Sequence, residues 1–188
     1  MKYLIVGLGN IGEEYRNTRH NIGFVIADAL AASGELVFAP VRYGAMAQMK
    51  YRGRLLMILK PSTYMNLSGK AVKYWMDKEN IPLENLLVIS DDIDLNMGIL
   101  RMKAKGSGGS HNGLNNIIEY LETTNFPRLR FGIGRNFAAG QQIHFVLGQW
   151  EPEEETVVNE RKNTAVEMIK SFIMAGIGDT MTRYNNKI

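Results

Sequence analysis

Short apolar runs alternate with polar, glycine-containing segments along the 188-residue chain, and this pattern predicts an α/β fold. The runs at 2–6 and 86–90 are almost entirely apolar, as expected of strands that are buried on both faces of a sheet. Apolar residues at near-helical spacing predict helices over 20–32, 68–78 and 114–122. Because the length suits one domain and no linker interrupts the pattern, we expect a single domain.

Other segments give weaker signals. Residues 35–61 predict short strands, and Ser68 is a plausible cap for the helix that follows them. The run at 144–147 predicts one more short strand. Proline and acidic residues then mark the start of a long helix over 152–175, and the glycines of 176–178 should break it.

Basic residues are unevenly placed, although the formal net charge is only +3. Six of them flank a glycine-rich loop at 106–110: Arg101, Lys103, Lys105, Arg128, Arg130 and Arg135. On both sides of this loop the basic residues alternate with apolar ones, which predicts strands with one basic face. Such a face either binds a phosphate-bearing partner or is simply solvated. The loop itself is expected to be flexible and could move as a flap.

The chain has no cysteine, which excludes disulfides, a thiol nucleophile and thiolate metal sites, and fits a reducing cytosol. No apolar run approaches the ~18 residues of a membrane span, and the first residues lack a signal-peptide pattern. The expected location is therefore the cytoplasm.

Gly7, Gly9 and Gly12 follow the first predicted strand with the spacing of a dinucleotide-binding loop. Glu13 and Glu14 would lie where the phosphates bind and would repel them, and no apolar helical period follows. A nucleotide-dependent redox function is therefore disfavoured, and the glycines more simply allow a tight turn.

Familiar catalytic patterns are absent from the sequence. None of the three histidines, at positions 20, 111 and 144, has the spacing of a zinc site, and no serine lies in a G-x-S-x-G turn. Three aspartates, at 91, 92 and 94, could hold Mg²⁺, but no phosphate-binding loop accompanies them and they could equally cap a strand end or turn.

A histidine, one of these aspartates and several asparagines remain as candidates, all on loops that should meet at one edge of the sheet. A histidine held by a carboxylate can activate water, and neutral amides can bind a carbonyl or an oxyanion. Each of these residues could instead be structural, as a turn, a cap or a satisfied histidine. From the residues alone, we predict a hydrolase with a basic surface for an acidic partner.

Four blocks of the chain resemble bacterial peptidyl-tRNA hydrolases: GLGNIGEEYRNTRHNIG, KPSTYMNLSGKAV, DDIDLNMGILRMKAKGSGGSHNGLNNI and FPRLRFGIGR. They occur in the family order from residue 7 to 135, and HFVLGQW after them also fits. The resemblance implies one α/β domain over residues 1–188, with a twisted mixed β-sheet flanked by helices. It also implies hydrolysis of the ester between a peptide, or an N-blocked amino acid, and tRNA.

The resemblance also implies roles for individual residues. His20 would be the general base that activates water, Asp91 would orient it, and Asn10 would contact the peptide part. Four further residues would shape the substrate channel: Tyr15, Tyr64, Asn66 and Asn112. Lys103 and Arg130 match positions that contact tRNA phosphates, in agreement with the basic strands. Neither a cofactor nor a metal is implied, and the expected form is a cytoplasmic monomer that recycles tRNA in translation, without membrane attachment.

The chain departs from the family pattern at three places. Ile11 stands where proline is common, which should loosen the first loop. Ser110 stands where glycine is usual, and Asn96-Met97 replaces a proline-containing string. These departures concern loop conformation more than the catalytic residues. The rival hypothesis is a non-catalytic RNA-binding module, which would bind tRNA without cleaving the ester.

Overall fold

The computed structural model describes residues 1–185 and confirms an α/β domain built on one mixed sheet of seven strands. The strand order is β2-β3-β4-β1-β5-β7-β6. Four strands are parallel and form its centre: β4 (Arg54–Pro61), β1 (Lys2–Gly7), β5 (Leu86–Asp92) and β7 (Arg128–Gly132). Three strands complete the sheet: β2 (Ala39–Val41), β3 (Gly44–Tyr51) and β6 (Leu100–Lys103). β3 runs antiparallel to both β2 and β4, and β6 runs antiparallel to β7.

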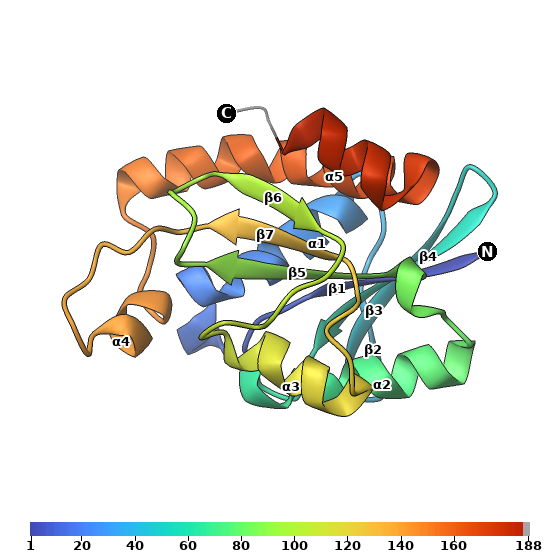
Figure 1. Cartoon of the computed structure of the whole chain (residues 1–188), viewed down its shortest axis with the longest axis horizontal. Helices are drawn as coiled ribbons and strands as arrows, with labels where there is room; N and C mark the ends of the chain where they lie inside the picture. The colour runs from blue at the N-terminus through green and yellow to red at the C-terminus, as the bar shows by residue number, and fades with distance from the viewer. Residues whose placement is uncertain (186–188) are drawn as a thin grey trace.

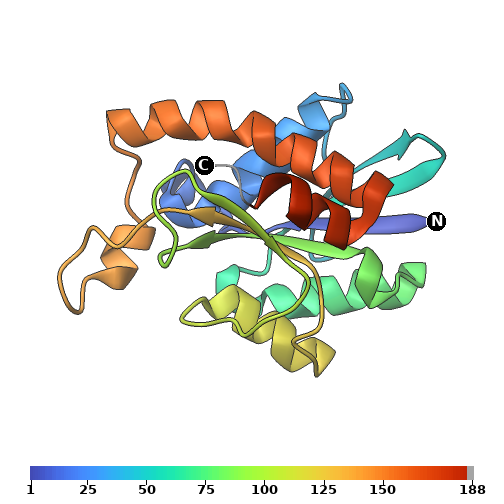
Figure 2. The ribbon, with the colours of Figure 1, turned by 45° about the horizontal axis from the view of Figure 1, so that its top comes forward.

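Helices cover both faces of the sheet (Figures 1 and 2). On one face lie α1 (Ile22–Ala32) and α5 (Pro152–Tyr184), and on the other α2 (Ser68–Glu79) and α3 (Asn112–Leu121). The predicted break within α5 is present as a kink at Gly176, where φ is 83°. The short α4 (Gln142–Val146) lies to one side of these layers. Short 3-10 turns complete the structure: η1 (Glu13–Tyr15), η2 (Arg19–Asn21), η3 (Met65–Leu67) and η4 (Leu83–Asn85).

The central strand β1 shows why the apolar runs are continuous. Tyr3 and Ile5 pack in the core beneath α1 and α5, whereas Leu4 and Val6 pack in the core against α2 and α3. Successive strand residues point to opposite faces, so a strand covered on both sides must be apolar at every position.

The glycine that ends β1 allows close packing against α1. A Cβ atom on Gly7 would lie 2.1 Å from the carbonyl oxygen of Gly23, so the end of β1 can touch the start of α1 only because both residues are glycine. After Gly12 the chain forms the short turn η1 rather than a long helix. This geometry agrees with the rejection of a dinucleotide-binding loop.

Two local predictions were wrong. Residues 144–147 belong to α4 and its end rather than to a strand: Phe145 and Val146 are buried, and the amide of Phe145 donates to the carbonyl of Gln141 at 2.9 Å. A run of four apolar residues does not distinguish a strand from a buried helical turn. Ser68 does not cap α2, because its hydroxyl donates back to the carbonyl of Met65 at 2.8 Å.

Among residues 1–185, none of the helices combines the length and the apolar character that crossing a membrane requires.

Candidate active site

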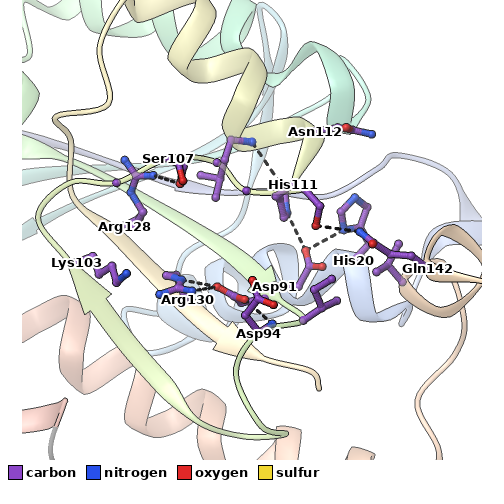
Figure 3. A pocket seen from close by; sticks show the side chains of 18 of the residues that line it. His20, Asp91, Asp94, Lys103, Ser107, His111, Asn112, Arg128, Arg130 and Gln142 are labelled. Carbon is purple, nitrogen blue, oxygen red and sulfur yellow. Dashed lines mark hydrogen bonds and ion pairs between the residues drawn. The ribbon is translucent and has the colours of Figure 1, made fainter. Parts of the chain in front are cut away.

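Asp91, near the carboxyl end of β5, is hydrogen-bonded to two histidines, one that precedes it in the sequence and one that follows it (Figure 3). One of its oxygens, Oδ1, lies 2.8 Å from Nδ1 of His20 and 2.9 Å from Nε2 of His111. His20 lies in η2, directly before α1, and His111 lies directly before α3. The side chain of Asp91 is only 3% exposed, so this carboxylate is almost fully desolvated and depends on its two partners.

The hydrogen-bond partners of the two histidines determine which ring nitrogens carry protons. The amide of Leu114 donates to Nδ1 of His111 at 3.2 Å, so in the neutral ring the proton is on Nε2 and is donated to Asp91. Asp91 likewise accepts from Nδ1 of His20. This arrangement leaves Nε2 of His20 unprotonated in the neutral ring and able to accept a proton.

The pKa values of this pair are shifted in opposite directions. Burial disfavours the charged form of Asp91, but attraction to His20 and His111 and their hydrogen bonds outweigh it, so the pKa of Asp91 is lowered and it stays ionised. Burial also opposes the charging of His20, yet the charge and hydrogen bond of Asp91 raise the pKa of His20 above 6.5. The pair therefore stabilises an imidazolium next to a carboxylate.

His111 is the residue that the sequence-based prediction missed. It has neither a zinc-binding spacing nor a catalytic sequence pattern of its own. Its position directly before a helix and after a loop at the same sheet edge was the available signal.

Asn10 is held rigidly by two other segments. Its backbone amide donates to Oδ1 of Asn21 at 2.8 Å, and Nδ2 of Asn21 donates back to its carbonyl at 2.9 Å. Its own Oδ1 accepts from the amide of Met65 at 2.6 Å. The oxygen of the Asn10 side chain is therefore occupied. Nδ2 of Asn10, a hydrogen-bond donor, has no hydrogen-bond partner among residues 1–185.

The loop that contacts Asn10 is strained. Tyr64, which precedes Met65, has φ 61° and ψ 160°, a conformation that only glycine adopts readily. Such strain persists only where the surrounding structure enforces it, and the hydrogen bond between Met65 and Asn10 is one such restraint.

A cavity of ≈ 320 Å³ joins the histidine–aspartate pair to the basic side of the sheet (Figure 3). His20 and Asp91 lie at one part of its wall, and Lys103 and Arg130 at another. Asn112, loop 106–110 and α4 also line it. Of the other predicted residues, Tyr64 and Asn66 are exposed in the loop after β4, and Tyr15 is half-buried in η1; none of the three lines this cavity. Asn10 does not line it either but lies at a separate, neighbouring cavity.

The basic face differs from the sequence-based prediction. Arg128 is only 1% exposed and donates to the carbonyls of Ser107 and Thr124, so it anchors the glycine-rich loop rather than facing solvent. Burial and the nearby charge of Arg130 lower the pKa of Arg128 to about 10. Arg130 forms an ion pair with Asp92, whereas Lys103 has no carboxylate partner within residues 1–185.

Three potential metal ligands meet at Asp91, because His20, Asp91 and His111 offer ligand atoms within 4.8 Å of one another. However, both ring nitrogens that face Asp91 donate protons to it, and the amide of Leu114 favours this tautomer of His111. A metal ion bound there would have to displace both protons.

The fold and the site thus define a class: an enzyme of the α/β fold class, built on one mixed sheet, in which a histidine–aspartate pair opens into a cavity lined by basic residues. The comparisons with known proteins identify the family. The family model described as peptidyl-tRNA hydrolase matches residues 4–188, so the chain belongs to the peptidyl-tRNA hydrolase family of enzymes.

Individual relatives agree with this assignment. The chain is 60% identical to a peptidyl-tRNA hydrolase of Phocaeicola vulgatus and 57% identical to one of Bacteroides fragilis, each over 187 residues and the full length of both proteins. The crystal structure of peptidyl-tRNA hydrolase from Acinetobacter baumannii superposes with a TM-score of 0.93 at 33% identity, covering 98% of this chain and 94% of that one.

Proposed function

We propose that the chain hydrolyses the ester bond that joins a peptide, or an N-blocked amino acid, to tRNA, and that His20 is the general base. The observation that carries this proposal is the hydrogen bond between His20 and Asp91, which leaves Nε2 of His20 as a proton acceptor on the cavity wall. The family membership supplies the substrate class.

In the proposed reaction, Nε2 of His20 takes a proton from a water molecule as the water oxygen attacks the ester carbonyl. The resulting imidazolium is stabilised by the ionised Asp91. When the tetrahedral intermediate collapses, the bond between the carbonyl carbon and the ribose oxygen breaks, and the imidazolium returns its proton to that oxygen. The products are the free peptide and tRNA with a free terminal hydroxyl.

His111 acts on this reaction through Asp91. By donating to the same carboxylate oxygen, it holds Asp91 in the orientation that His20 requires. Its own ring is fixed by the amide of Leu114, so the support extends to the first turn of α3.

The amide group of Asn10 is proposed to bind a carbonyl of the peptide part. Its free Nδ2 can donate to a peptide or acyl carbonyl, which an N-blocked amino acid has and a free aminoacyl group lacks. This difference would favour blocked substrates. Four further side chains are proposed to shape the substrate channel: Tyr15, Tyr64, Asn66 and Asn112.

Lys103 and Arg130 are proposed to contact tRNA phosphates, since both line the cavity that contains His20. They do not contribute equally, because Arg130 shares its charge with Asp92. We further propose that the chain acts as a cytoplasmic monomer without a cofactor.

The decisive experiment measures release of an N-acetylated amino acid from tRNA by the wild-type protein and by His20→Ala. We expect the variant to fold, as checked by circular dichroism, and to lose about 10²–10⁴ in rate, the usual contribution of a general base. Wild-type turnover in the folded variant would refute the role of His20. Tight tRNA binding by the wild-type protein without any ester cleavage would favour the non-catalytic RNA-binding module.

A further inference from the structure

A second basic surface lies at the opposite edge of the sheet from Lys103. Lys103 is on the edge strand β6, whereas this surface is formed by the turn after β2, the other edge strand, and by the adjacent helix α2 (Figure 1). It consists of five residues, here called the α2 patch: Arg42, Tyr43, Lys70, Tyr74 and Lys78. Arg42, Lys70 and Lys78 are exposed, and the two tyrosines are half-buried between them.

The cations of the α2 patch lie over aromatic rings. The guanidinium of Arg42 is 5.0 Å from the ring centres of both Tyr43 and Tyr74. The ammonium of Lys70 is 5.0 Å from the ring of Tyr43, and that of Lys78 is 5.8 Å from the ring of Tyr74. These distances are within the range of cation–π attraction, so the patch holds its positive charges in a defined arrangement.

None of these three cations is paired with a carboxylate in the described part of the chain. By contrast Lys73, on the same helix, forms an ion pair with Asp77 at 2.8 Å. The excess positive charge also affects the titration of Tyr43: the hydrogen bond from Arg42 and the charges of Arg42 and Lys70 lower the pKa of Tyr43. The patch therefore carries uncompensated positive charge at the surface.

The backbone of the patch is fixed in place. Nε1 of Trp75 donates to the carbonyl of Arg42 at 2.9 Å, which ties the turn to α2. The amide of Ser62 donates to the carbonyl of Tyr43 at 2.8 Å, which ties it to the loop leaving β4. That same loop reaches Asn10 through Met65, so the turn of the α2 patch and the candidate active site both lie at the carboxyl ends of the parallel strands, although they are at different edges of the sheet.

We propose that the α2 patch is an RNA-binding surface that contacts the phosphodiester backbone. Uncompensated Arg and Lys side chains attract phosphates, and interleaved aromatic side chains are typical of surfaces that bind RNA strands. The same cations could attract an acidic peptide, but the carboxylates of such a peptide would interact only with the cations, whereas RNA bases can also stack on the tyrosine rings. The proposal goes beyond ester hydrolysis, and it does not depend on the role of His20.

The test compares two charge-matched triple variants. Arg42→Gln/Lys70→Gln/Lys78→Gln removes the cations of the patch. Lys50→Gln/Arg52→Gln/Lys170→Gln removes three cations at the opposite end of β3, where Arg52 and Lys170 also lie over a tyrosine, Tyr51. Both variants change the net charge equally, and both remove the same kind of cation–aromatic contact.

Binding of deacylated tRNA is measured over a series of KCl concentrations, so that ester cleavage plays no part. We expect the patch variant to bind more weakly and its salt slope to fall by roughly 2–3, about 0.7–0.9 for each lost phosphate contact. The slope of the control variant should match that of the wild-type protein. Circular dichroism checks folding, and the single variants Lys70→Gln and Lys78→Gln provide smaller steps if the triple variant does not fold.

Three results would overturn the proposal. Equal losses in both triple variants would show a nonspecific effect of net charge. Unchanged tRNA binding by the folded patch variants would show that the patch does not contact RNA. Loss of binding to a glutamate-rich peptide or to anionic vesicles, with tRNA binding intact, would assign the patch to a different partner.

Discussion

Arg130 and Asp92 form an ion pair inside the cavity that also contains His20. The two side chains, from the neighbouring strands β7 and β5, are only 17% and 13% exposed, so the pair is largely withdrawn from solvent. A phosphate approaching Arg130 therefore meets a guanidinium whose charge is already balanced. Lys103, on the adjacent strand β6, offers a charge that no carboxylate balances within residues 1–185.

This difference predicts unequal effects on tRNA binding. Lys103→Ala should reduce the salt slope of binding by roughly 0.7–0.9, the value for one lost phosphate contact. Arg130→Ala should weaken binding by more than the double variant Asp92→Asn/Arg130→Gln, because the single change leaves an unpaired carboxylate facing the phosphates. Titrations with deacylated tRNA at several salt concentrations measure both quantities. Equal affinities of the single and double Arg130 variants would show that Asp92 has no such effect.

The raised pKa of His20 predicts how activity depends on pH. The general base must be neutral, so kcat/KM should fall as the pH drops through the pKa of His20, which lies above 6.5. In Asp91→Asn the carboxylate charge is gone and burial remains, which lowers the pKa of His20. The acid limb of the profile should therefore move to lower pH, while the plateau falls because the imidazolium loses its partner.

The matched control for the pH profile is His144→Gln, which removes an exposed histidine of α4 and should leave the profile unchanged. An acid limb that stays in place in Asp91→Asn would show that a group other than His20 controls the rate.

The strands and long helices were predictable because their apolar periods are regular. The choice among the three aspartates was not. Asp91 and Asp92 are successive residues of β5 and point to opposite sides, one toward His20 and the other toward Arg130. The alternation of side chains along a strand predicts that Asp91 and Asp92 lie on opposite faces of the sheet, but it does not predict which of the two contacts a histidine. Only the family resemblance selected Asp91, in agreement with the observed hydrogen bond.

Arg128 shows a second limit of sequence patterns. Its alternation with apolar residues predicts a basic face, but the guanidinium is buried, and the carbonyls of Ser107, Thr124 and Phe126 accept its hydrogen bonds. A period of two identifies the face of a strand, whereas the burial of that face depends on loops distant in the sequence. The role of His111 was hidden for the same reason, since its partner Asp91 is 20 residues away.

The side chain of Asn10 has two proposed functions, which substitutions can separate: its oxygen accepts from the amide of Met65, and its Nδ2 donates to the substrate. In Asn10→Asp the retained oxygen can still accept from the amide of Met65, but the donor group is lost. In Asn10→Ala both are lost, and the strained conformation of Tyr64 loses a restraint. We expect Asn10→Asp to lose less thermal stability than Asn10→Ala, because only Asn10→Asp keeps an acceptor for the amide of Met65, which offsets part of the cost of the buried carboxylate.

If Nδ2 of Asn10 binds a substrate carbonyl, Asn10→Asp should raise KM for N-acetyl-aminoacyl-tRNA by about 3–10-fold, the equivalent of one hydrogen bond of roughly 0.5–1.5 kcal/mol. Discrimination against unblocked aminoacyl-tRNA should fall by a similar factor, because the lost contact is one that only the blocked substrate makes. Asn10→Ala should show the same kinetic change together with a lower melting temperature, since the amide of Met65 then lacks its acceptor. Steady-state kinetics with both substrates and thermal melting of both variants measure these effects. Loss of stability in Asn10→Ala with unchanged KM and unchanged discrimination in Asn10→Asp would restrict Asn10 to holding the loop after β4.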